Sequence, residues 1–188
     1  MTVPTELDRL FRERAAAEGA LDVAYDLTDS PVGELLLAAT GRGVCRISFD
    51  PEPQAELEAL ARAYGVRVLR SPGPLDAPRR ELEEYFEGRR HQFGVDVDLA
   101  ALPSFQQLVL TELRRVPYGR TDTYGGLAAR IGRPRAARAV GGALNRNPVP
   151  IVVPCHRIVG ASGNLVGYAG GLERKEKLLA LEGALLAG

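Results

Sequence analysis

The sequence predicts two domains: an α/β domain with a small mixed or antiparallel sheet over residues 1–100, and a mostly α-helical domain with a helix-turn-helix over residues 101–188. Three observations lead to this prediction. Short β-rich segments separated by glycine and proline turns fill residues 22–50. The pattern changes around "VDVDLAALPS", and helical periodicity dominates after it. A chain of 188 residues is long enough to build two small cores.

The composition is that of a globular protein, with 45% hydrophobic and 26% charged residues. No apolar run approaches the roughly 20 residues that a bilayer span requires, and the N-terminal stretch lacks the apolar centre of a secretory signal. Cys45 and Cys155 are too few for a disulfide framework, and no cysteine and histidine cluster indicates a metal. We therefore expect a cytoplasmic protein with no membrane partner, no metal and no cofactor.

The first domain takes its elements from "DVAYDLTDSPVGELLLAATGRGVCRISFD", which contains the β-rich segments. A helix, "PQAELEALARAYG", ends at Gly65, as a C-terminal glycine predicts. "VRVLR" is a further strand, and "APRRELEEYFEGRR" is a second helix ending near Gly88. Cys45 lies within the apolar pattern "GVCRISF", which is typical of a core residue. Nothing in this part indicates a reactive site.

The second domain begins with a helix, "SFQQLVLTELRRV", for which Ser104 is the expected N-cap. Its expected inward face is Phe105, Leu108, Val109 and Leu113. After the turn "PYGRTD", Thr123 can cap the helix "YGGLAARI", which Gly132 ends. Pro134 suits the first turn of the next helix, "PRAARAVGGALNRN". Two short helices joined by a glycine-containing turn form a helix-turn-helix pattern.

The second helix of this pair carries almost no large side chains and has Gly141 and Gly142 at its middle. Each glycine inside a helix costs about 1 kcal/mol relative to alanine. That cost is explained if another surface approaches the backbone closely. The surface is either a DNA groove or a neighbouring element of the protein, and the arginines beside the pair favour DNA.

The zero net charge hides a segregation along the chain. Residues 103–160 carry nine arginines against Glu112 and Asp122, a net of +7, whereas residues 1–102 carry twelve arginines against nineteen acids. A basic segment in an otherwise acidic chain is typical of a protein that binds a polyanion. A solvated arginine-rich surface is the alternative.

The segment "NPVPIVVPCHRIVG" places one of two cysteines beside one of two histidines. It reads as a turn at Asn147, an apolar β segment, and a break at Pro154 that leaves the thiol at the edge of a loop. A free thiol is only a few per cent thiolate at neutral pH, so a nucleophilic Cys155 needs a base or a cation, and His156 and Arg157 offer both. From spacing alone, a buried inert cysteine fits equally well. A glycine-rich loop and a closing helix, "ERKEKLLALEG", follow.

Together, "YGGLAARIGRPRAARAVGGALNRNP" and "NPVPIVVPCHRIVGASGNLVGYAGGLERKEKLLALEG" closely resemble the O6-alkylguanine-DNA alkyltransferases. The resemblance is strong over residues 104–183 and holds only in outline before residue 100, through "DSPVGELLLAAT" and the helix before "FGVDVDL". It implies a ribonuclease H-like fold for the first domain. The chain lacks the tryptophan that the family often carries in the helix from Phe105; Thr111 lies near that position.

The resemblance also implies chemistry for particular residues. Cys155 corresponds to the acceptor thiolate, and His156 to the histidine that draws the thiol proton through a water. Glu182 corresponds to the acid that polarises this histidine. Asn147 corresponds to the hinge asparagine between the helix-turn-helix and the active-site segment.

On the DNA side, Tyr124 corresponds to the tyrosine that crowds the target phosphate and donates to the guanine ring. Arg138 corresponds to the arginine that enters the base stack and fills the gap left by the flipped base. The carbonyls of Cys155 and Ile158 are expected to read the guanine amino edge. The further residues expected at the substrate or the DNA are Ala139, Gly141, Pro150, Arg157, Tyr168, Ala169 and Gly170.

The implied activity is direct reversal of DNA damage. A monomer would flip O6-alkylguanine out of duplex DNA, with O4-alkylthymine as a further candidate lesion, and move the alkyl group irreversibly to Cys155, once per molecule. Three alternatives stay open at this point: an alkyltransferase-like protein that binds lesions without reacting, a helix-turn-helix transcription factor, and a cysteine hydrolase.

Overall fold

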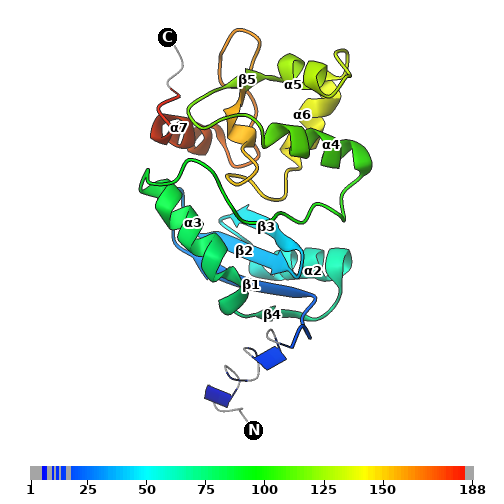
Figure 1. The fold of residues 1–188 in the computed structure, drawn as a ribbon, viewed down its shortest axis with the longest axis vertical. Helices are drawn as coiled ribbons and strands as arrows, with labels where there is room; N and C mark the ends of the chain where they lie inside the picture. Colours follow the sequence, from blue (N-terminus) through cyan, green and yellow to red (C-terminus); the bar gives the residue numbers. More distant parts are fainter. Residues whose placement is uncertain (1–5, 8–9, 11, 13, 16–17, 185–188) are drawn as a thin grey trace. The chain divides into compact units, whose positions relative to one another are not determined.

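The computed structural model describes residues 6–7, 10, 12, 14–15 and 18–184 of the chain (Figure 1). The chain divides into two compact units, one of residues 1–85 and 94–101 and the other of residues 86–93 and 102–188. The segment 86–93, which lies within the predicted first domain, thus belongs with the second unit. No helix in the described ranges is long and apolar enough to cross a membrane.

The first unit is built on a four-stranded mixed sheet of order β3-β2-β1-β4. Its strands are β1 (Val23–Thr28), β2 (Leu35–Thr40), β3 (Gly43–Phe49) and β4 (Val68–Arg70). The first three form an antiparallel meander in which Leu37 pairs with Asp26 on one side and Ile47 on the other, while β4 joins β1 in parallel. The sequence predicts a small sheet that is either mixed or antiparallel, and the sheet is mixed.

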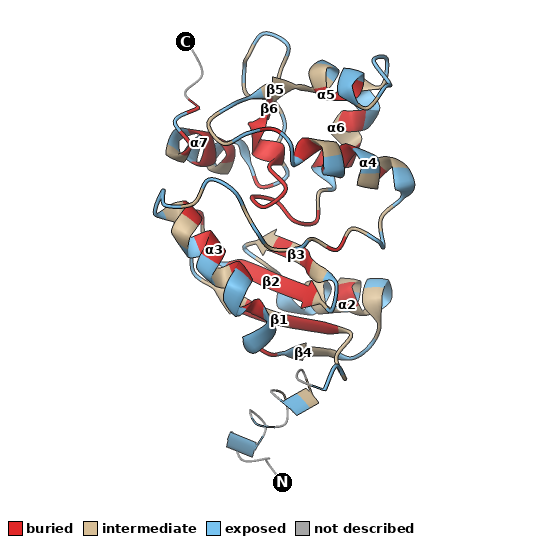
Figure 2. Ribbon diagram, in the orientation of Figure 1, coloured by how far each residue is buried: buried red, intermediate tan, exposed pale blue. Residues whose placement is uncertain are grey.

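Helices cover both faces of this sheet, which is why almost all of β2 is buried (Figure 2). Leu60 of α2 (Pro53–Tyr64) packs into a cluster with Val23, Leu36, Ala38 and Cys45. The 3₁₀ turn η1 (Gly73–Leu75) and α3 (Asp76–Phe86) follow, and Figure 1 shows α3 on the opposite face. Burial raises the pKa of the Cys45 thiol to about 12, as expected for an inert core residue.

The second unit is mainly helical. Its helices are α4 (Ser104–Leu113), α5 (Tyr124–Arg130), α6 (Ala137–Asn145) and α7 (Leu172–Leu181), with a 3₁₀ turn η2 (Cys155–Arg157). Two short strands, β5 (Asp122–Thr123) and β6 (Ile158–Val159), pair in parallel. The helices α4, α5 and α6 pack together, with α5 and α6 as the predicted helix-turn-helix.

Helix α5 begins as the sequence predicts, because the Thr123 hydroxyl accepts a hydrogen bond from Gly126 N at 2.9 Å. Two details of α4 differ from expectation. Pro103 rather than Ser104 precedes the first helical residue, and Leu108 is 43% exposed. Gln106 is buried in its place, since its amide donates to the carbonyl of Arg146 at 2.7 Å and so satisfies the C-terminal end of α6.

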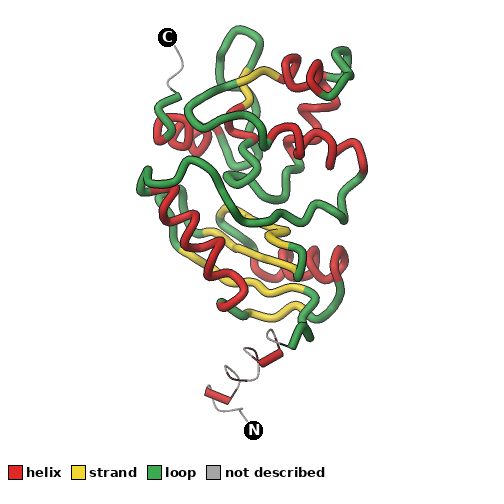
Figure 3. The backbone as a smooth tube through the Cα atoms, in the orientation of Figure 1, coloured by secondary structure: helices red, strands yellow, loops and turns green. Residues whose placement is uncertain are grey.

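The prediction of an apolar β segment before Cys155 is wrong. Residues 147–154 form a buried turn without strand pairing, and Figure 3 shows how much of the chain between α6 and α7 is loop. Three prolines in this stretch lack the N–H groups that a strand ladder requires. Ile151 adopts φ 73°, a left-handed conformation that is rare for a β-branched residue.

Candidate active site

The turn 147–154 positions the cysteine through a single side chain. Asn147 Oδ1 accepts from Val149 N at 3.1 Å, and its Nδ2 donates to the carbonyl of Val153 at 2.8 Å. The same Nδ2 lies 3.1 Å from Cys155 Sγ. Asn147 therefore adds to the backbone hydrogen bonds of the turn, such as that from Val153 N to the carbonyl of Val149 at 2.9 Å, and links the geometry of the turn to the thiol.

Cys155 lies at the wall of a cavity of about 210 Å³. The cavity is lined by Tyr124, Gly141, Leu144, Asn145, Cys155, Gly167, Tyr168 and Ala169. The cysteine is 8% exposed, and this burial raises the pKa of its thiol to about 11, against the lowering effect of the hydrogen bond from Asn147. At neutral pH the resting thiol is protonated, so any nucleophilic reaction requires a base.

A buried network of three charged or titratable side chains lies next to the thiol. His156 Nε2 is 2.8 Å from Glu182 Oε1, and Arg157 donates from Nη2 to Oε1 and from Nε to Oε2, both at 2.9 Å. Gly119 N also donates to Oε2, at 3.2 Å. Burial alone raises the pKa of Glu182, but the hydrogen bonds from His156 and Arg157 outweigh it and bring the pKa to about 2.

The tautomer of His156 follows from this network. Glu182 is ionised at neutral pH and has no proton to donate, so the proton in the 2.8 Å contact belongs to His156 Nε2. Burial lowers the pKa of His156, which is fully buried, so the ring is neutral at physiological pH. The lone pair is then on Nδ1, a buried atom with no hydrogen-bond partner among the described residues. His156 thus offers an unused acceptor in the residue that follows the cysteine.

Lys175 of α7 is a further buried charge near the thiol, which was not predicted from the sequence. Its Nζ donates to the carbonyls of Ile158 at 2.6 Å and Val166 at 2.8 Å. Burial lowers the pKa of Lys175 to about 8, whereas the neighbouring Cys155 raises it. A sequence signal existed: counted from Lys175, the buried residues Leu178, Leu179 and Glu182 follow at three, four and seven positions, so the lysine continues a buried stripe.

The pairing of β5 with β6 brings Tyr124 to the cavity. Thr123 pairs with Val159, so the first residue of α5 starts beside the chain that leaves the cysteine. The Tyr124 hydroxyl donates to the carbonyl of Val166 at 3.3 Å, and burial raises its pKa. Tyr124 therefore spans the cavity from the helix-turn-helix to the loop before α7.

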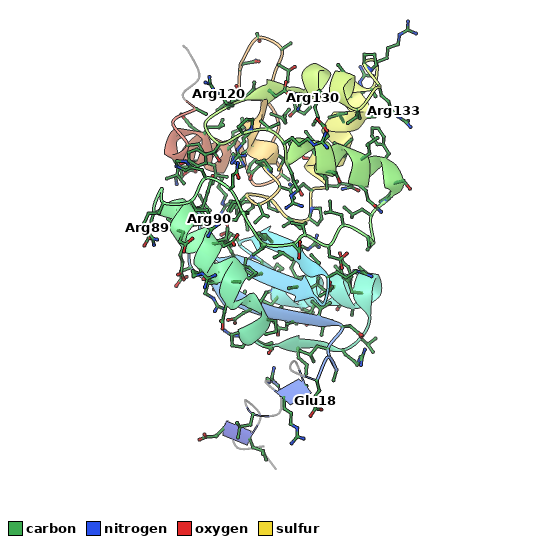
Figure 4. The ribbon with its side chains drawn as sticks, viewed as in Figure 1. Glu18, Arg89, Arg90, Arg120, Arg130 and Arg133 are labelled. Carbon is green, nitrogen blue, oxygen red and sulfur yellow. The ribbon has the colours of Figure 1, made fainter. Side chains whose placement is uncertain are left out.

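The outer face of α6 is bare. Arg138 and Ala139 are exposed, and a Cβ added to Gly141 would lie 3.6 Å from the Tyr124 ring, an ordinary contact. A Cβ on Gly142 would meet only the Arg146 guanidinium, at 3.9 Å. Packing inside the protein therefore does not require either glycine. Figure 4 shows Arg130 and Arg133 around the connection between α5 and α6; Arg130 pairs with Glu112 and Asp122.

The cavity brings together five of the residues expected at the site: Tyr124, Gly141, Cys155, Tyr168 and Ala169. Four others are buried away from its lining. Pro150 lies in the turn, the Ile158 carbonyl accepts from Lys175, Arg157 binds Glu182 and the carbonyl of Val116, and the Gly170 carbonyl accepts from Arg174. The lining residues Leu144, Asn145 and Gly167 were not predicted from the sequence. Leu144 and Asn145 follow Gly141 by three and four positions, so helical periodicity could have found them.

These features define a helix-turn-helix protein with a thiol at the wall of a cavity beside the bare helix. Among the described residues, no group of three histidine, cysteine, aspartate or glutamate side chains is arranged to hold a metal ion.

Residues 104–184 match the family model "6-O-methylguanine DNA methyltransferase, DNA binding domain", and residues 23–99 match its "ribonuclease-like domain". The chain belongs to the 6-O-methylguanine DNA methyltransferase family, which confirms the resemblance and the fold class predicted from the sequence.

Relatives named methylated-DNA--protein-cysteine methyltransferase are similar over most of their length. The one from Methanosarcina acetivorans is 42% identical over 169 residues, covering 85% of this chain and 98% of the relative. The one from Mycobacterium tuberculosis is 41% identical over 160 residues, covering 85% and 92%. A crystal structure of the M. tuberculosis O6-methylguanine methyltransferase aligns at 40% identity with a TM-score of 0.74, covering 88% of this chain and 95% of that one. A crystal structure of the M. tuberculosis protein in complex with DNA aligns at 40% identity with a TM-score of 0.75, covering 86% and 93%.

Proposed function

We propose that this protein repairs duplex DNA by direct reversal, moving the alkyl group of O6-alkylguanine onto Cys155 once per molecule. The observation that carries the proposal is the position of the Cys155 thiol at a cavity that also reaches Gly141 on the bare helix α6. A base inside the duplex is out of reach of any side chain, so a protein of this kind must extrude the base into such a pocket.

The transfer is a displacement at carbon. The Cys155 sulfur attacks the alkyl carbon, the bond from that carbon to O6 breaks, and its electron pair stays with the guanine oxygen. The thiol proton passes to His156 Nδ1 through a water, and guanine takes up one proton, so the products are S-alkylcysteine and guanine. Because water does not readily hydrolyse a thioether, the protein is consumed stoichiometrically.

The helix-turn-helix would bind the duplex through its minor groove, where a slim alanine and glycine helix fits and an inserted side chain can replace an unstacked base. In this proposal Arg138 fills the gap, Tyr124 crowds the target phosphate, and the arginines of residues 103–160 contact the backbone with little sequence preference. The backbone carbonyls of Cys155 and Ile158 accept hydrogen bonds from the guanine amino group. One lone pair of the Ile158 oxygen already accepts from Lys175, so guanine would use the second. We further propose that the protein is a cytoplasmic monomer and that O4-alkylthymine is a second substrate.

Titration of the protein against duplex DNA with a labelled O6-methyl group tests this proposal. We expect transfer to stop at one methyl per active protein, with the mass of one methyl gained on the Cys155 peptide. Repeated turnover would indicate a hydrolase, and lesion binding without a mass change would indicate an alkyltransferase-like binder. Preference among undamaged sequences would indicate a transcription factor.

Cys155→Ala provides the matched variant. It removes the nucleophile but leaves the cavity and the helix-turn-helix in place, so we expect lesion binding within about threefold of the wild type and no transfer. Gel-shift binding and methyl counting on the same DNA make the comparison. Transfer that persists in Cys155→Ala would rule out this sulfur as the acceptor.

A further inference from the structure

Arg157 and His156 share one carboxylate, although the two side chains are expected to act differently. Both Arg157 contacts to Glu182 are 2.9 Å long and reach different oxygens, which is the two-point geometry that fixes a carboxylate in one plane. The Arg157 guanidinium also donates to the carbonyl of Val116 at 2.7 Å and lies 5.9 Å from the Tyr118 ring centroid. It is 5% exposed and does not line the cavity at Cys155.

We infer that Arg157 is a positioning residue for alkyl transfer: by binding both oxygens of Glu182, it fixes the carboxylate against His156 Nε2 and keeps the imidazole neutral, with its lone pair on Nδ1. This inference deepens the proposed function and rests on it. It replaces the expectation that Arg157 contacts DNA or substrate.

The physical reason is competition for the charge of Glu182. A buried carboxylate 2.8 Å from an imidazole would, by itself, stabilise the imidazolium, which has no lone pair and cannot accept the thiol proton. Arg157 neutralises the carboxylate and adds a positive charge of its own, and both effects oppose protonation of His156. Glu182 can then orient the ring without protonating it.

The other charged and titratable groups around the His156 ring either favour or oppose its protonation. Lys175 on α7 is a cation and also opposes the imidazolium, whereas Glu182, at the end of α7, favours it. Cys155, on the same 3₁₀ turn, is a neutral thiol at rest, and Tyr118 faces Glu182 while donating its hydroxyl to the carbonyl of Leu181 at 3.0 Å. Because Arg157 touches Glu182 directly, its removal should have a larger effect on His156 than removal of the Lys175 charge.

The chain has only two histidines, so ¹⁵N-histidine NMR reports on His156 directly once a His91→Gln sample assigns the signals. In the wild type we expect a neutral ring protonated at Nε2. In Arg157→Gln we expect its titration midpoint to rise by about 1–3 pH units. In Arg157→Lys the ammonium can bind one of the two Glu182 oxygens and keeps the positive charge, although it is more strongly hydrated than a guanidinium. We therefore expect a smaller rise in the His156 midpoint.

Single-turnover transfer from free O6-benzylguanine, measured from pH 5 to pH 9, gives the second readout. The acid limb of the rate should move with the NMR midpoint, so that Arg157→Gln loses about tenfold at a pH one unit below its midpoint while its alkaline plateau is kept. Arg46→Lys, which alters another arginine paired to a carboxylate, should change neither readout.

An unchanged His156 midpoint in folded Arg157→Gln would overturn the inference, as would a wild-type ring protonated at Nδ1. If Arg157→Gln does not fold, the Arg157→Lys midpoint decides, and a value equal to that of the wild type overturns it. A uniform loss of rate at all pH values indicates a merely structural arginine and also overturns it. Absence of transfer in the wild type would instead refute the proposed function, since the NMR titration does not depend on transfer.

Discussion

At the scale of single residues, the thiol of Cys155 shows why the site needs more than a cysteine. With a pKa of about 11, on the order of one molecule in ten thousand carries a thiolate at pH 7. Asn147 donates to the sulfur and Lys175 is a nearby cation, and both favour the thiolate, but burial outweighs them. Proton removal by a positioned neutral base is therefore the step that the surrounding residues must support.

Lys175→Met tests how much of the pocket depends on one buried amine. Methionine fills a similar volume but leaves the carbonyls of Ile158 and Val166 without their donor, at a cost of about 1–3 kcal/mol per buried group. Relief of the buried charge offsets part of this cost. We expect a loss of about 2–3 kcal/mol in the free energy of unfolding, and at least tenfold slower transfer from O6-benzylguanine. Lys177→Met, on the exposed side of α7, is the control, and equal effects of the two changes would contradict a specific role for Lys175.

At the scale of elements, the sequence predicted best where local signals were strong. Helix α5 begins after the Thr123 cap and ends just before Gly132, and helix α2 ends at Gly65. Each of these residues has a conformational or capping preference that tertiary contacts did not override. Helix α6 begins at Ala137 rather than in the turn of Pro134, since the residues between form a tight connection. Leu108 faces outward because Gln106 points inward, where its amide donates a hydrogen bond to the carbonyl of Arg146 at the end of α6.

The turn 147–154 could not be predicted from local pattern, because apolar β-branched residues in it resemble a strand. Its shape depends on the Asn147 side chain and on the left-handed Ile151. The candidate site was predictable only in part for the same reason. Cys155 and His156 are visible as neighbours, but the contact between Arg157 and Glu182 spans 25 positions.

The left-handed conformation of Ile151 predicts that glycine at this position is at least as stable as alanine, the reverse of the usual order. Removal of its fully buried side chain should cost about 2–5 kcal/mol in either Ile151→Ala or Ile151→Gly. At φ 73° alanine keeps a penalty of about 1–2 kcal/mol that glycine does not have, which offsets the usual advantage of alanine. We therefore expect Ile151→Gly to be at least as stable as Ile151→Ala in urea unfolding. At Val149, buried without a positive φ, Gly should be less stable than Ala; the same order at both positions would show that Ile151 is unstrained.

The bare helix α6 gives a prediction about the substrate. Arg138→Ala removes the side chain proposed to fill the gap in the duplex, where unstacking costs a few kcal/mol. We expect repair of duplex O6-methylguanine to slow by about 10–100-fold and reaction with free O6-benzylguanine to change less than twofold. Arg62→Ala, an exposed arginine of α2, is the control for a general loss of charge. Equal losses on both substrates would remove the proposed role of Arg138.

At the scale of the whole molecule, net charge is a poor guide to the partner. The chain is neutral overall, yet the segment of residues 103–160 carries the positive excess and contains the helix-turn-helix. Interactions of exposed charges are screened within about 8–10 Å at physiological salt, so a DNA backbone responds to the charges close to it and not to the net charge of the chain. The acidic first 102 residues bring the net charge of the whole chain to zero.

The stability of the whole chain should fall with acid because of the same residues that build the site. The pKa of Glu182 drops from 4.5 to about 2 on folding, so its stabilisation is fully present above pH 4.5 and is lost as the pH falls toward 2. This loss corresponds to about 3 kcal/mol. The pKa of His156 is also lowered on folding, so the unfolded chain binds a proton first as the pH falls below 6.5, and this effect has the same sign.

Urea unfolding between pH 7 and pH 2.5 measures both contributions. We expect Glu182→Gln to be less stable at pH 7 by about 3–5 kcal/mol, because the buried Arg157 then lacks its anion. Its stability should also depend less on pH between 4.5 and 2.5, since the group that titrates in the wild type is gone. Glu58→Gln, an exposed acid on α2, should retain the wild-type slope. A Glu182→Gln slope as steep as that of the wild type would mean that acids elsewhere in the chain control its acid unfolding.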